Sequence, residues 1–527
     1  MKSWRSNFSV HGIIHALLLC ASVSALAALP RGHVFFQSDF EGPDDLNPWS
    51  GRKQVETGHQ SARSLCVENR GASKSGASAS LTLPAEAMRG HVVQVSAWVK
   101  AQDVSAKPNP WNGVKLMLVI QTPEGPEYPQ APLGVGSFDW QQAVYQARIP
   151  TNATKITLIA GMEQVTGKVW FDDVKISVYR AMRTDVPAPV AGPMHKGHAL
   201  PRLRGAMVAP NLTEASLLIF GQEWNANVIR WQLIRHGKPG APSSLEDYDA
   251  WLDGQLNKLD EVLGWCARAK VLVVVDLHSP PGGKSTTSGY VGSDDRLFTD
   301  RKVQDKFVAV WERITKKYRG NPWIWGFDLA NEPVEDFVAE DCDDWQALAE
   351  RAGKAVRALD PDRTLIVEPS KWGGPDGLRD FLPINVSKVV YSVHMYLPGE
   401  FTHQGVHRKD APPVEYPGQI GGKRWDKAEL ERALQPVVDF QKRFNVQIYM
   451  GEFSAIRWAP NQSAHRYLKD VIDIFEAHDW DWSYHAFREW SGWSVEHTED
   501  PQNNQPAAQP TERQKLLQSW YAKNQKP

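Results

Sequence analysis

The sequence predicts a multidomain protein in which an N-terminal all-β, jelly-roll-like sandwich is followed by a (β/α)8 TIM barrel. The first observation is a series of short alternating apolar segments, without helical stretches, from about residue 33 to 179. The second is a proline-rich segment over residues 181–200, which resists both helix and sheet. The third is a regular alternation of strand-like runs and long amphipathic stretches after that segment.

Residues 1–28 have the pattern of a secretory signal peptide. Lys2 and Arg5 precede an apolar stretch over residues 13–26, which ends in the small-residue pattern Ala25-Leu26-Ala27. We therefore expect an exported protein, secreted or periplasmic. An uncleaved membrane anchor is the alternative, although the stretch is short for a spanning helix and contains polar residues.

The predicted sandwich occupies residues 29–180. Its strand-like runs alternate apolar and polar residues, as strands with one buried face do, and Gly, Pro, Asn and Asp separate them. The clearest runs are 91–99, 114–120, 155–160 and 168–178. We expect the domain boundary in the linker at 181–200.

The predicted barrel domain spans residues 201–527. Strands are expected near residues 205–209, 227–233, 271–277, 324–330, 364–368, 389–395, 446–451 and 482–487. Helices are expected over residues 245–269, 301–318, 344–359, 427–443 and 464–477. Because the catalytic groups of such barrels gather at the carboxyl ends of the strands, each strand end is a candidate position for chemistry.

The composition indicates an uncharged partner. The formal net charge is −2 with both signs interspersed, so neither a nucleic acid nor an anionic membrane is indicated. The 22 tryptophans are unusual, because indole can cover the flat face of a sugar ring, although most of them are expected in the core. After the signal segment the cysteines are Cys66, Cys266 and Cys342, which have no metal-like spacing and allow at most one disulfide.

Two predicted strands each deliver one glutamate at the carboxyl end. Glu332 stands in Ala330-Asn331-Glu332-Pro333 after the fourth strand, and Glu452 stands in Gly451-Glu452-Phe453 after the seventh. Paired carboxylates on a rigid scaffold are what glycoside hydrolysis requires. Glu332, if shielded from water, would have a raised pKa and protonate the leaving oxygen, which makes Glu452 the candidate nucleophile.

Other strand ends carry polar groups that suit this chemistry. Arg230 lies among apolar residues of the second strand and needs a carboxylate partner, either Glu452 or a structural acid. His278 follows Asp276 at the third strand and can donate to a sugar hydroxyl or to a catalytic carboxylate, unless it is structural.

The remaining candidates lie after the fourth, sixth and eighth strands. Asn331 can hydrogen-bond the sugar 2-hydroxyl, a contact that strengthens in the transition state. His394 and Tyr396 alternate onto one face of the sixth strand, where His394 can tune the proton donor and Tyr396 can hold a carboxylate. Trp490, after the eighth strand, is the candidate aromatic platform for the sugar.

From about 200 to 522, the chain resembles glycoside hydrolase family 5, the cellulase and mannanase family of retaining clan A enzymes. The resemblance rests on the order of Asn227-x-x-Arg230, Asp276-Leu-His278, Asn331-Glu332-Pro333, His394-x-Tyr396 and Gly451-Glu452. It implies Glu332 as acid/base and Glu452 as nucleophile. The sequence departs from the family pattern at Trp231, where a smaller aliphatic is frequent, and at residues 484–487, where a tryptophan is frequent.

The sandwich resembles carbohydrate-binding modules of families 4, 9 and 22, on the segments Asp39-Phe40-Glu41-Gly42 and 170–174. The resemblance implies a structural calcium near Glu41, Asp172 and Asp173, with ordinary surface acids as the alternative. Trp111 and Trp49 are candidates for stacking on sugar. A module that has lost glycan binding and only braces the barrel is the alternative.

The sequence therefore predicts an exported retaining β-glycoside hydrolase that acts by double displacement on a β-linked poly- or oligosaccharide, endo-acting on a β-glucan or mannan. It is expected to be a monomer that has no cofactor or catalytic metal and that, after signal cleavage, has no membrane span. The alternatives are a non-catalytic carbohydrate-binding protein on an enzyme scaffold, or a glycosidase acting on a glycolipid or another glycan.

Overall fold

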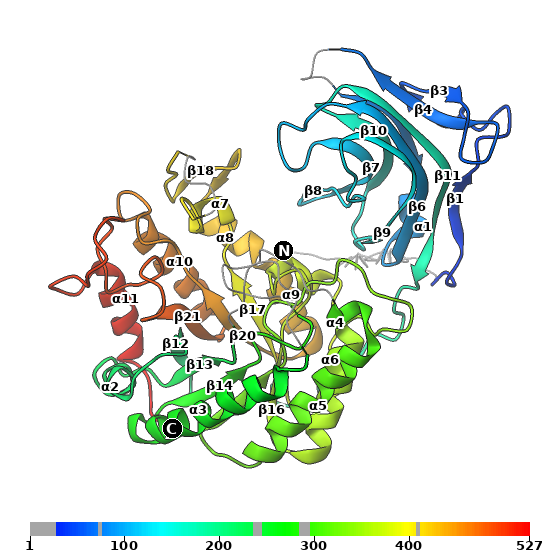
Figure 1. Cartoon of the computed structure of the whole chain (residues 1–527). Coiled ribbons are helices and arrows are strands. Elements are labelled where there is room, and N and C mark those ends of the chain that lie inside the picture. Colours follow the sequence, from blue (N-terminus) through cyan, green and yellow to red (C-terminus); the bar gives the residue numbers. More distant parts are fainter. Residues whose placement is uncertain (1–27, 72–75, 236–244, 284–295, 407–411) are drawn as a thin grey trace, which may run out of the picture.

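The computed structural model describes residues 28–71, 76–235, 245–283, 296–406 and 412–527. The expected signal peptide therefore lies almost wholly outside the described residues. Figure 1 shows two bodies side by side, a strand-rich N-terminal part and a larger part in which helices surround a barrel.

The N-terminal part is built from two antiparallel sheets. One has the order β3-β4-β11-β6-β9 with β1 paired to β11, and the other has the order β2-β5-β10-β7-β8. The strands are β1 (Val34–Ser38), β2 (Ser50–Gly51), β3 (Gln54–Glu56), β4 (Ser64–Asn69), β5 (Ala77–Leu83), β6 (Val92–Val104), β7 (Gly113–Thr122), β8 (Gly125–Glu127), β9 (Gly136–Arg148), β10 (Lys155–Glu163) and β11 (Gly167–Arg180). The short helix α1 (Ala85–Met88) joins β5 to β6.

Strand alternation fills the space between these sheets. In β6, Val93, Val95, Ala97 and Val99 are buried, whereas the residues between them are half-buried. This period of two is the pattern that predicted the sandwich, and the predicted strand-rich fold is confirmed.

The second part is a closed parallel barrel of eight strands in the order β12-β13-β14-β15-β16-β17-β20-β21. Their bounds are β12 (Arg204–Val208), β13 (Val228–Gln232), β14 (Leu272–Asp276), β15 (Ile324–Asp328), β16 (Thr364–Val367), β17 (Val389–Met395), β20 (Gln447–Phe453) and β21 (Asp481–Phe487). Each coincides closely with a predicted strand, so the predicted (β/α)8 barrel is confirmed.

Long helices cover the barrel, and short elements decorate its loops. The long helices are α3 (Tyr248–Ala269), α5 (Arg301–Tyr318), α6 (Trp345–Leu359), α9 (Gln435–Phe444), α10 (Ser463–Ala477) and α11 (Glu512–Tyr521). The short elements are α2 (Glu214–Leu218), the π-helical turn η1 (Ile219–Glu223), α4 (Arg296–Thr299), the 3-10 turn η2 (Pro375–Arg379), α7 (Gly399–Thr402), the hairpin strands β18 (Gly418–Ile420) and β19 (Lys423–Trp425), and α8 (Lys427–Ala433).

The single helix predicted over 427–443 is wrong. The chain forms α8, breaks at Leu434, and restarts as α9 with Pro436 in its first turn. Proline lacks the N–H that a helix interior needs but fits the first turn, so Pro436 starts a new helix instead of continuing α8.

The predicted linker at 181–200 has no helix or strand, and it is held against the barrel. Val190 N–H donates to the Phe444 carbonyl at 2.9 Å, and the Asn445 amide donates to the Val190 and Gly192 carbonyls. Trp325 Nε1 donates to the Lys196 carbonyl at 2.8 Å. The linker therefore follows the barrel surface instead of acting as a free tether.

Cys66, Cys266 and Cys342 are buried free thiols in the structure. Within the described ranges, no helix has the length and apolarity needed to cross a membrane.

Candidate active site

The carboxyl ends of the barrel strands bring acidic, basic and aromatic side chains into one cluster. Arg230 comes from β13 and Asp276 from β14, whereas Asp328 and the segment with Glu332 belong to β15 and the loop after it. Glu368 follows β16, His394 lies in β17, and Glu452 lies in β20. The parallel barrel directs these groups to the same face because its strands all point one way.

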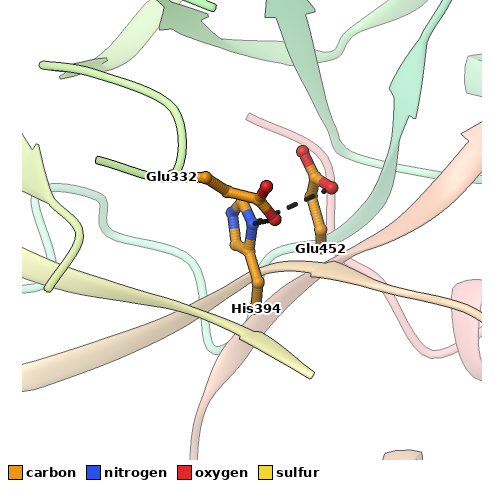
Figure 2. Close-up of side chains that lie close together, drawn as sticks. All are labelled: Glu332, His394 and Glu452. Carbon is orange, nitrogen blue, oxygen red and sulfur yellow. Dashed lines mark hydrogen bonds and ion pairs between the residues drawn. The ribbon is translucent and has the colours of Figure 1, made fainter. Parts of the chain in front are cut away.

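The carboxylates of Glu332 and Glu452 both approach Nδ1 of His394 (Figure 2). His394 Nδ1 is 2.8 Å from Glu332 Oε1 and 3.8 Å from Glu452 Oε2. One oxygen from each carboxylate and one nitrogen of His394 all lie within 4.8 Å of one another. The two glutamates proposed from sequence therefore lie beside the same ring nitrogen of His394.

Arg230 is the centre of the charge network. Its guanidinium is 2.6 Å from Glu452 Oε1 and is fully buried. It also contacts the following groups: Asp328 at 3.0 Å, Glu368 at 2.9 Å, Asp276 at 3.2 Å and Asn331 Oδ1 at 3.0 Å. Both partners that the sequence left open for Arg230, the nucleophile candidate and structural acids, are present at once.

Cations hold Glu452 in its charged form. Burial alone would raise the pKa of Glu452, but His394, His485 and Arg230 outweigh it and hold that pKa well below its usual range. Burial raises the pKa of the neighbouring Asp328 well above its usual range, because one arginine cannot compensate several buried carboxylates. The network therefore favours the protonated form of Asp328 and the ionised form of Glu452, which a nucleophile needs.

Glu368 was not identified from the sequence, yet it joins the two halves of the site. Its Oε2 accepts the backbone N–H of Glu332 at 2.8 Å, and its Oε1 lies 2.9 Å from Arg230 and 3.1 Å from His394 Nε2. Glu332 has a left-handed backbone with φ of 44°. Such a conformation costs free energy in a non-glycine residue, so the bond to Glu368 helps to hold it. The only sequence signal was an acid directly after the short strand β16.

The surroundings of His394 favour its protonated form. Burial opposes its protonation, but Glu368 and Glu452 outweigh that effect and hold the pKa of His394 well above its usual value. The residue lies in β17, on the same face as Tyr396, as predicted from the alternation of the strand.

Tyr396 and His485 complete the surroundings of Glu452. Tyr396 donates its hydroxyl to Glu452 Oε2 at 2.9 Å and lies 2.5 Å from His485 Nδ1. His485 Nδ1 is 3.3 Å from Glu452 Oε2, and Nε2 is 3.3 Å from Glu489 Oε2. Burial lowers the pKa of His485, but Glu452 and Glu489 raise it to about 10. His485 therefore places a second imidazolium beside the nucleophile candidate, in the segment where the family pattern has tryptophan.

His278 and Asn331 lie at the same face of the barrel. His278 Nδ1 bonds Asp276 Oδ2 at 2.8 Å, which leaves Nε2 as the ring nitrogen that can meet a substrate. Asn331 uses its Oδ1 on Arg230, so its amide N–H groups are the donors left for a sugar hydroxyl.

Trp490 belongs to a group of three tryptophans near the end of the eighth strand. It is 41% exposed and packs edge-on against Trp458 and Trp493, with ring centroids 5.9 and 5.4 Å away. Trp493, which the sequence analysis missed, lies 6.1 Å from the Tyr396 ring and 5.9 Å from the His485 ring. An aromatic surface therefore leads from the catalytic groups through Trp493 to the exposed Trp490.

The acids proposed for calcium in the sandwich are engaged in loop hydrogen bonds. Asp172 Oδ2 accepts the His59 N–H at 2.7 Å and the Ser61 hydroxyl at 2.8 Å, and Glu41 Oε1 accepts the Arg63 N–H at 2.7 Å. Asp173 lies beside them, with its own N–H bonded to Asp172 Oδ1. These bonds explain the placement of Asp172 and Glu41 without an ion.

The two aromatic candidates of the sandwich have opposite environments. Trp111 is 59% exposed and free to meet a ligand at the surface. Trp49 is 1% exposed and packs on Phe36 and Phe40, so the proposal that it stacks on sugar is wrong. It lies in the turn segment just before β2 and belongs to the core cluster of the sandwich.

A barrel with two neighbouring carboxylates at its carboxyl end has the arrangement that a glycoside hydrolase requires. Residues 194–494, more than half of the chain, match the family model described as cellulase, glycosyl hydrolase family 5. The chain belongs to this family and is a glycosidase that hydrolyses O-glycosyl compounds.

Curated relatives share this part of the chain. Endoglucanase C of Acetivibrio thermocellus is 28% identical over 248 residues, which cover 42% of this chain and 70% of the relative. Cellodextrinase A of Ruminococcus flavefaciens is 21% identical over 226 residues, which cover 42% of this chain and 64% of the relative. Among solved structures, endoglucanase Cel5A from Thermotoga maritima is 25% identical with a TM-score of 0.44, over 56% of this chain and 92% of that chain.

Proposed function

We propose that this protein is an exported, retaining β-glycoside hydrolase that cleaves within β-glucan chains. Glu452 acts as the nucleophile and Glu332 as the acid/base. The observation that carries the proposal is the placement of an oxygen of each carboxylate within 4.8 Å of the other and of His394. Retaining enzymes hold their carboxyl groups about 5–5.5 Å apart, whereas inverting enzymes need about 6.5–9.5 Å to admit a water molecule.

In the first step, Glu452 attacks the anomeric carbon and the bond to the leaving oxygen breaks. One proton is shared between His394 Nδ1 and Glu332 Oε1, which are 2.8 Å apart. Glu332 passes this proton to the leaving oxygen. The product is a glycosyl-enzyme ester on Glu452. Arg230 and the Tyr396 hydroxyl stabilise the carboxylate before attack and when it leaves again.

In the second step, Glu332 removes a proton from a water molecule that attacks the same carbon. The ester bond to Glu452 breaks and the sugar leaves with its original anomeric configuration. Asn331 and His278 are suited to hydrogen-bond hydroxyls of the sugar that Glu452 carries, because each has a donor directed by a fixed partner.

The choice of β-glucan rests on the relatives, several of which are named endoglucanase. A mannan backbone, a glycolipid or another glycan would use the same two carboxylates. The test is product analysis on a panel of defined β-glucans, mannans and glycolipids, with NMR of the first anomer released. We expect fragments of several lengths from a β-glucan, first released as the β-anomer, and first release of the α-anomer would contradict the mechanism.

A non-catalytic carbohydrate-binding protein is the competing function, and one variant separates the two. Glu452→Gln keeps the size and most of the hydrogen bonds of the side chain but removes the nucleophilic charge. We expect the wild type to release reducing sugar and the variant to release none above background. Equal absence of release from both proteins on every glycan would favour the binding function.

Export is a separate part of the proposal and rests on residues 1–28 alone. Expression of the full chain in a bacterium, followed by fractionation and N-terminal sequencing, tests it. A mature chain that begins near residue 29 outside the cytoplasm supports export, and an intact N-terminus in the cytoplasm contradicts it.

A further inference from the structure

The loop between β15 and α6, which contains Glu332, runs directly against the sandwich. The side chain of Gln146, on β9, bonds both backbone groups of Val338 in this loop: its amide donates to the carbonyl at 3.1 Å and its oxygen accepts the N–H at 3.1 Å. The Tyr179 hydroxyl, on β11, donates to the same carbonyl at 2.7 Å. All three residues are buried, so water does not replace these bonds.

Ion pairs extend the contact on both sides of Val338. Arg148 of β9 lies 3.1 Å from Glu335 Oε1, three residues after Glu332. Arg180 donates to the Cys342 carbonyl at 2.7 Å, and Arg183 lies 2.5 Å from Asp344. Asp344 also caps α6 by accepting the Ala347 N–H at 3.0 Å.

A continuous series of bonds leads from the sandwich to Glu332. Glu335 uses its second oxygen to accept the Trp345 N–H at 2.8 Å, and Trp345 Nε1 donates to the Glu368 carbonyl at 2.8 Å. The Glu368 carboxylate then accepts the Glu332 N–H at 2.8 Å. Arg148 is therefore linked to the backbone of Glu332 through Glu335, Trp345 and Glu368.

The sandwich also holds the next loop along the barrel. Lys371 lies 3.2 Å from Glu127 of β8, and Arg379 lies 3.0 Å from Glu124. Thr151 bonds Asp380 through its hydroxyl at 2.8 Å. The Gly373 carbonyl in this loop accepts the backbone N–H of His394 at 2.9 Å. The second loop therefore supports His394, whose ring contacts the Glu332 carboxylate.

We propose that the sandwich is a positioning element of the catalytic site: Gln146 and Arg148 hold the loop that fixes the Glu332 carboxyl against the leaving oxygen. The proposal rests on the acid/base role proposed for Glu332. A misplacement of about 1 Å costs a reaction about 100-fold in rate, and the left-handed backbone of Glu332 persists only while its surroundings hold it.

The leaving group of the substrate distinguishes this role from a general structural one. Departure of a poor leaving group requires a proton from the acid, whereas departure of 2,4-dinitrophenolate does not. Two aryl β-glycosides of the sugar found by product analysis are compared, one with 2,4-dinitrophenol and one with phenol as the leaving group. The value of kcat/KM reports the step in which this bond breaks.

The test variants are Gln146→Leu and Arg148→Met. We expect kcat/KM for the phenyl glycoside to fall about tenfold or more in each, while the value for the dinitrophenyl glycoside changes less than twofold. Arg148→Lys, which keeps the charge, should recover part of the loss. The matched controls are Gln142→Leu, on the exposed part of the same strand, and Arg70→Met, whose partner Glu68 lies within the sandwich; both should behave as wild type.

The variant Glu332→Ala distinguishes failure of the acid/base role of Glu332 from failure of the positioning role of the sandwich. If Glu332→Ala lowers kcat/KM equally for both substrates, the acid/base assignment itself fails. If Glu332→Ala shows the leaving-group dependence but Gln146→Leu and Arg148→Met lose nothing, or lose activity equally on both substrates, the positioning role of the sandwich is overturned. Circular dichroism confirms that each variant is folded, and Arg148→Met decides the matter if Gln146→Leu does not fold.

Discussion

Arg230 is a fully buried cation among the carboxylates of Asp276, Asp328, Glu368 and Glu452. Removal of one partner of a buried ion pair is costly, because the other charges stay in a medium of low dielectric. We expect Arg230→Met to lower the free energy of unfolding of the barrel by about 3–5 kcal/mol, measured by urea denaturation.

The control is Arg70→Met, because Arg70 is an exposed arginine of the sandwich whose pair with Glu68 contributes little. A loss in Arg230→Met no larger than that of the control would show that the buried network does not stabilise the fold.

The position of His485 beside Glu452 leads to a prediction about the pH dependence of kcat/KM. Its imidazolium is one of the cations that hold the pKa of Glu452 well below its usual value, together with His394 and Arg230. Attack requires ionised Glu452, so activity is lost as pH falls through that pKa. His485→Gln removes one cation, raises the pKa of Glu452, and should move the acidic limb of the kcat/KM profile to higher pH.

The control for this shift is His478→Gln, because His478 stacks on Trp480 at the end of α10, away from the carboxylates. An acidic limb at the same pH in wild type and His485→Gln would contradict the electrostatic role of His485.

Among single residues, the sequence identified charged side chains that stand in or directly after a predicted barrel strand, such as Arg230, Glu332 and Glu452. It missed Glu368 and Glu489, because a lone acid after a strand has no distinguishing pattern until its neighbours are placed. His485 was noticed only as a departure from the family pattern, since its pairing with Glu452 and Glu489 depends on how the eighth strand ends.

Among the elements, β12 and β13 approach each other at Gly205. A Cβ at Gly205 would lie 1.7 Å from the Val228 carbonyl oxygen, so Gly205→Ala must push the two strands apart. We expect Gly205→Ala to lower stability by about 1–3 kcal/mol or more and to lower the Tm of the barrel, measured by calorimetry.

The control is Gly254→Ala in α3, where a Cβ would meet nothing within 4 Å. Alanine is the better helix former by about 1 kcal/mol, so this variant should keep or raise the Tm. If Gly205→Ala were as stable as Gly254→Ala, the close strand approach would not constrain the barrel.

Element positions were predictable because the barrel strands are short apolar runs and the helices have strong amphipathic periods. The break between α8 and α9 was not predicted, because the helical spacing of apolar residues continues across residue 434 although Pro436 starts a new helix. Backbone chemistry overrode the pattern of side chains at this point.

For the whole molecule, the contacts between sandwich and barrel predict cooperative unfolding. The linker is bonded along the barrel, and buried groups such as Gln146 and Tyr179 lose their partners if either part opens. We expect calorimetry of the full chain to give one transition. Two transitions separated by many degrees would contradict this coupling.

The two fold classes were predictable from the change in pattern near residue 181, but the interface between them was not. It depends on which polar side chains of β9 and β11 meet the loop after β15, and nothing in the sequence marks residues such as Gln146 and Arg148 for that contact. Only the packed structure shows that this face is covered.

The assignment of Glu452 as nucleophile is tested most directly by trapping the intermediate. A 2-deoxy-2-fluoro β-glycoside with a 2,4-dinitrophenyl leaving group slows the second step, so that the glycosyl-enzyme accumulates and can be digested and sequenced by mass spectrometry. The account predicts one sugar per chain, attached to Glu452. A sugar on Glu332 or on another residue, or turnover of the substrate without any covalent species, would contradict it.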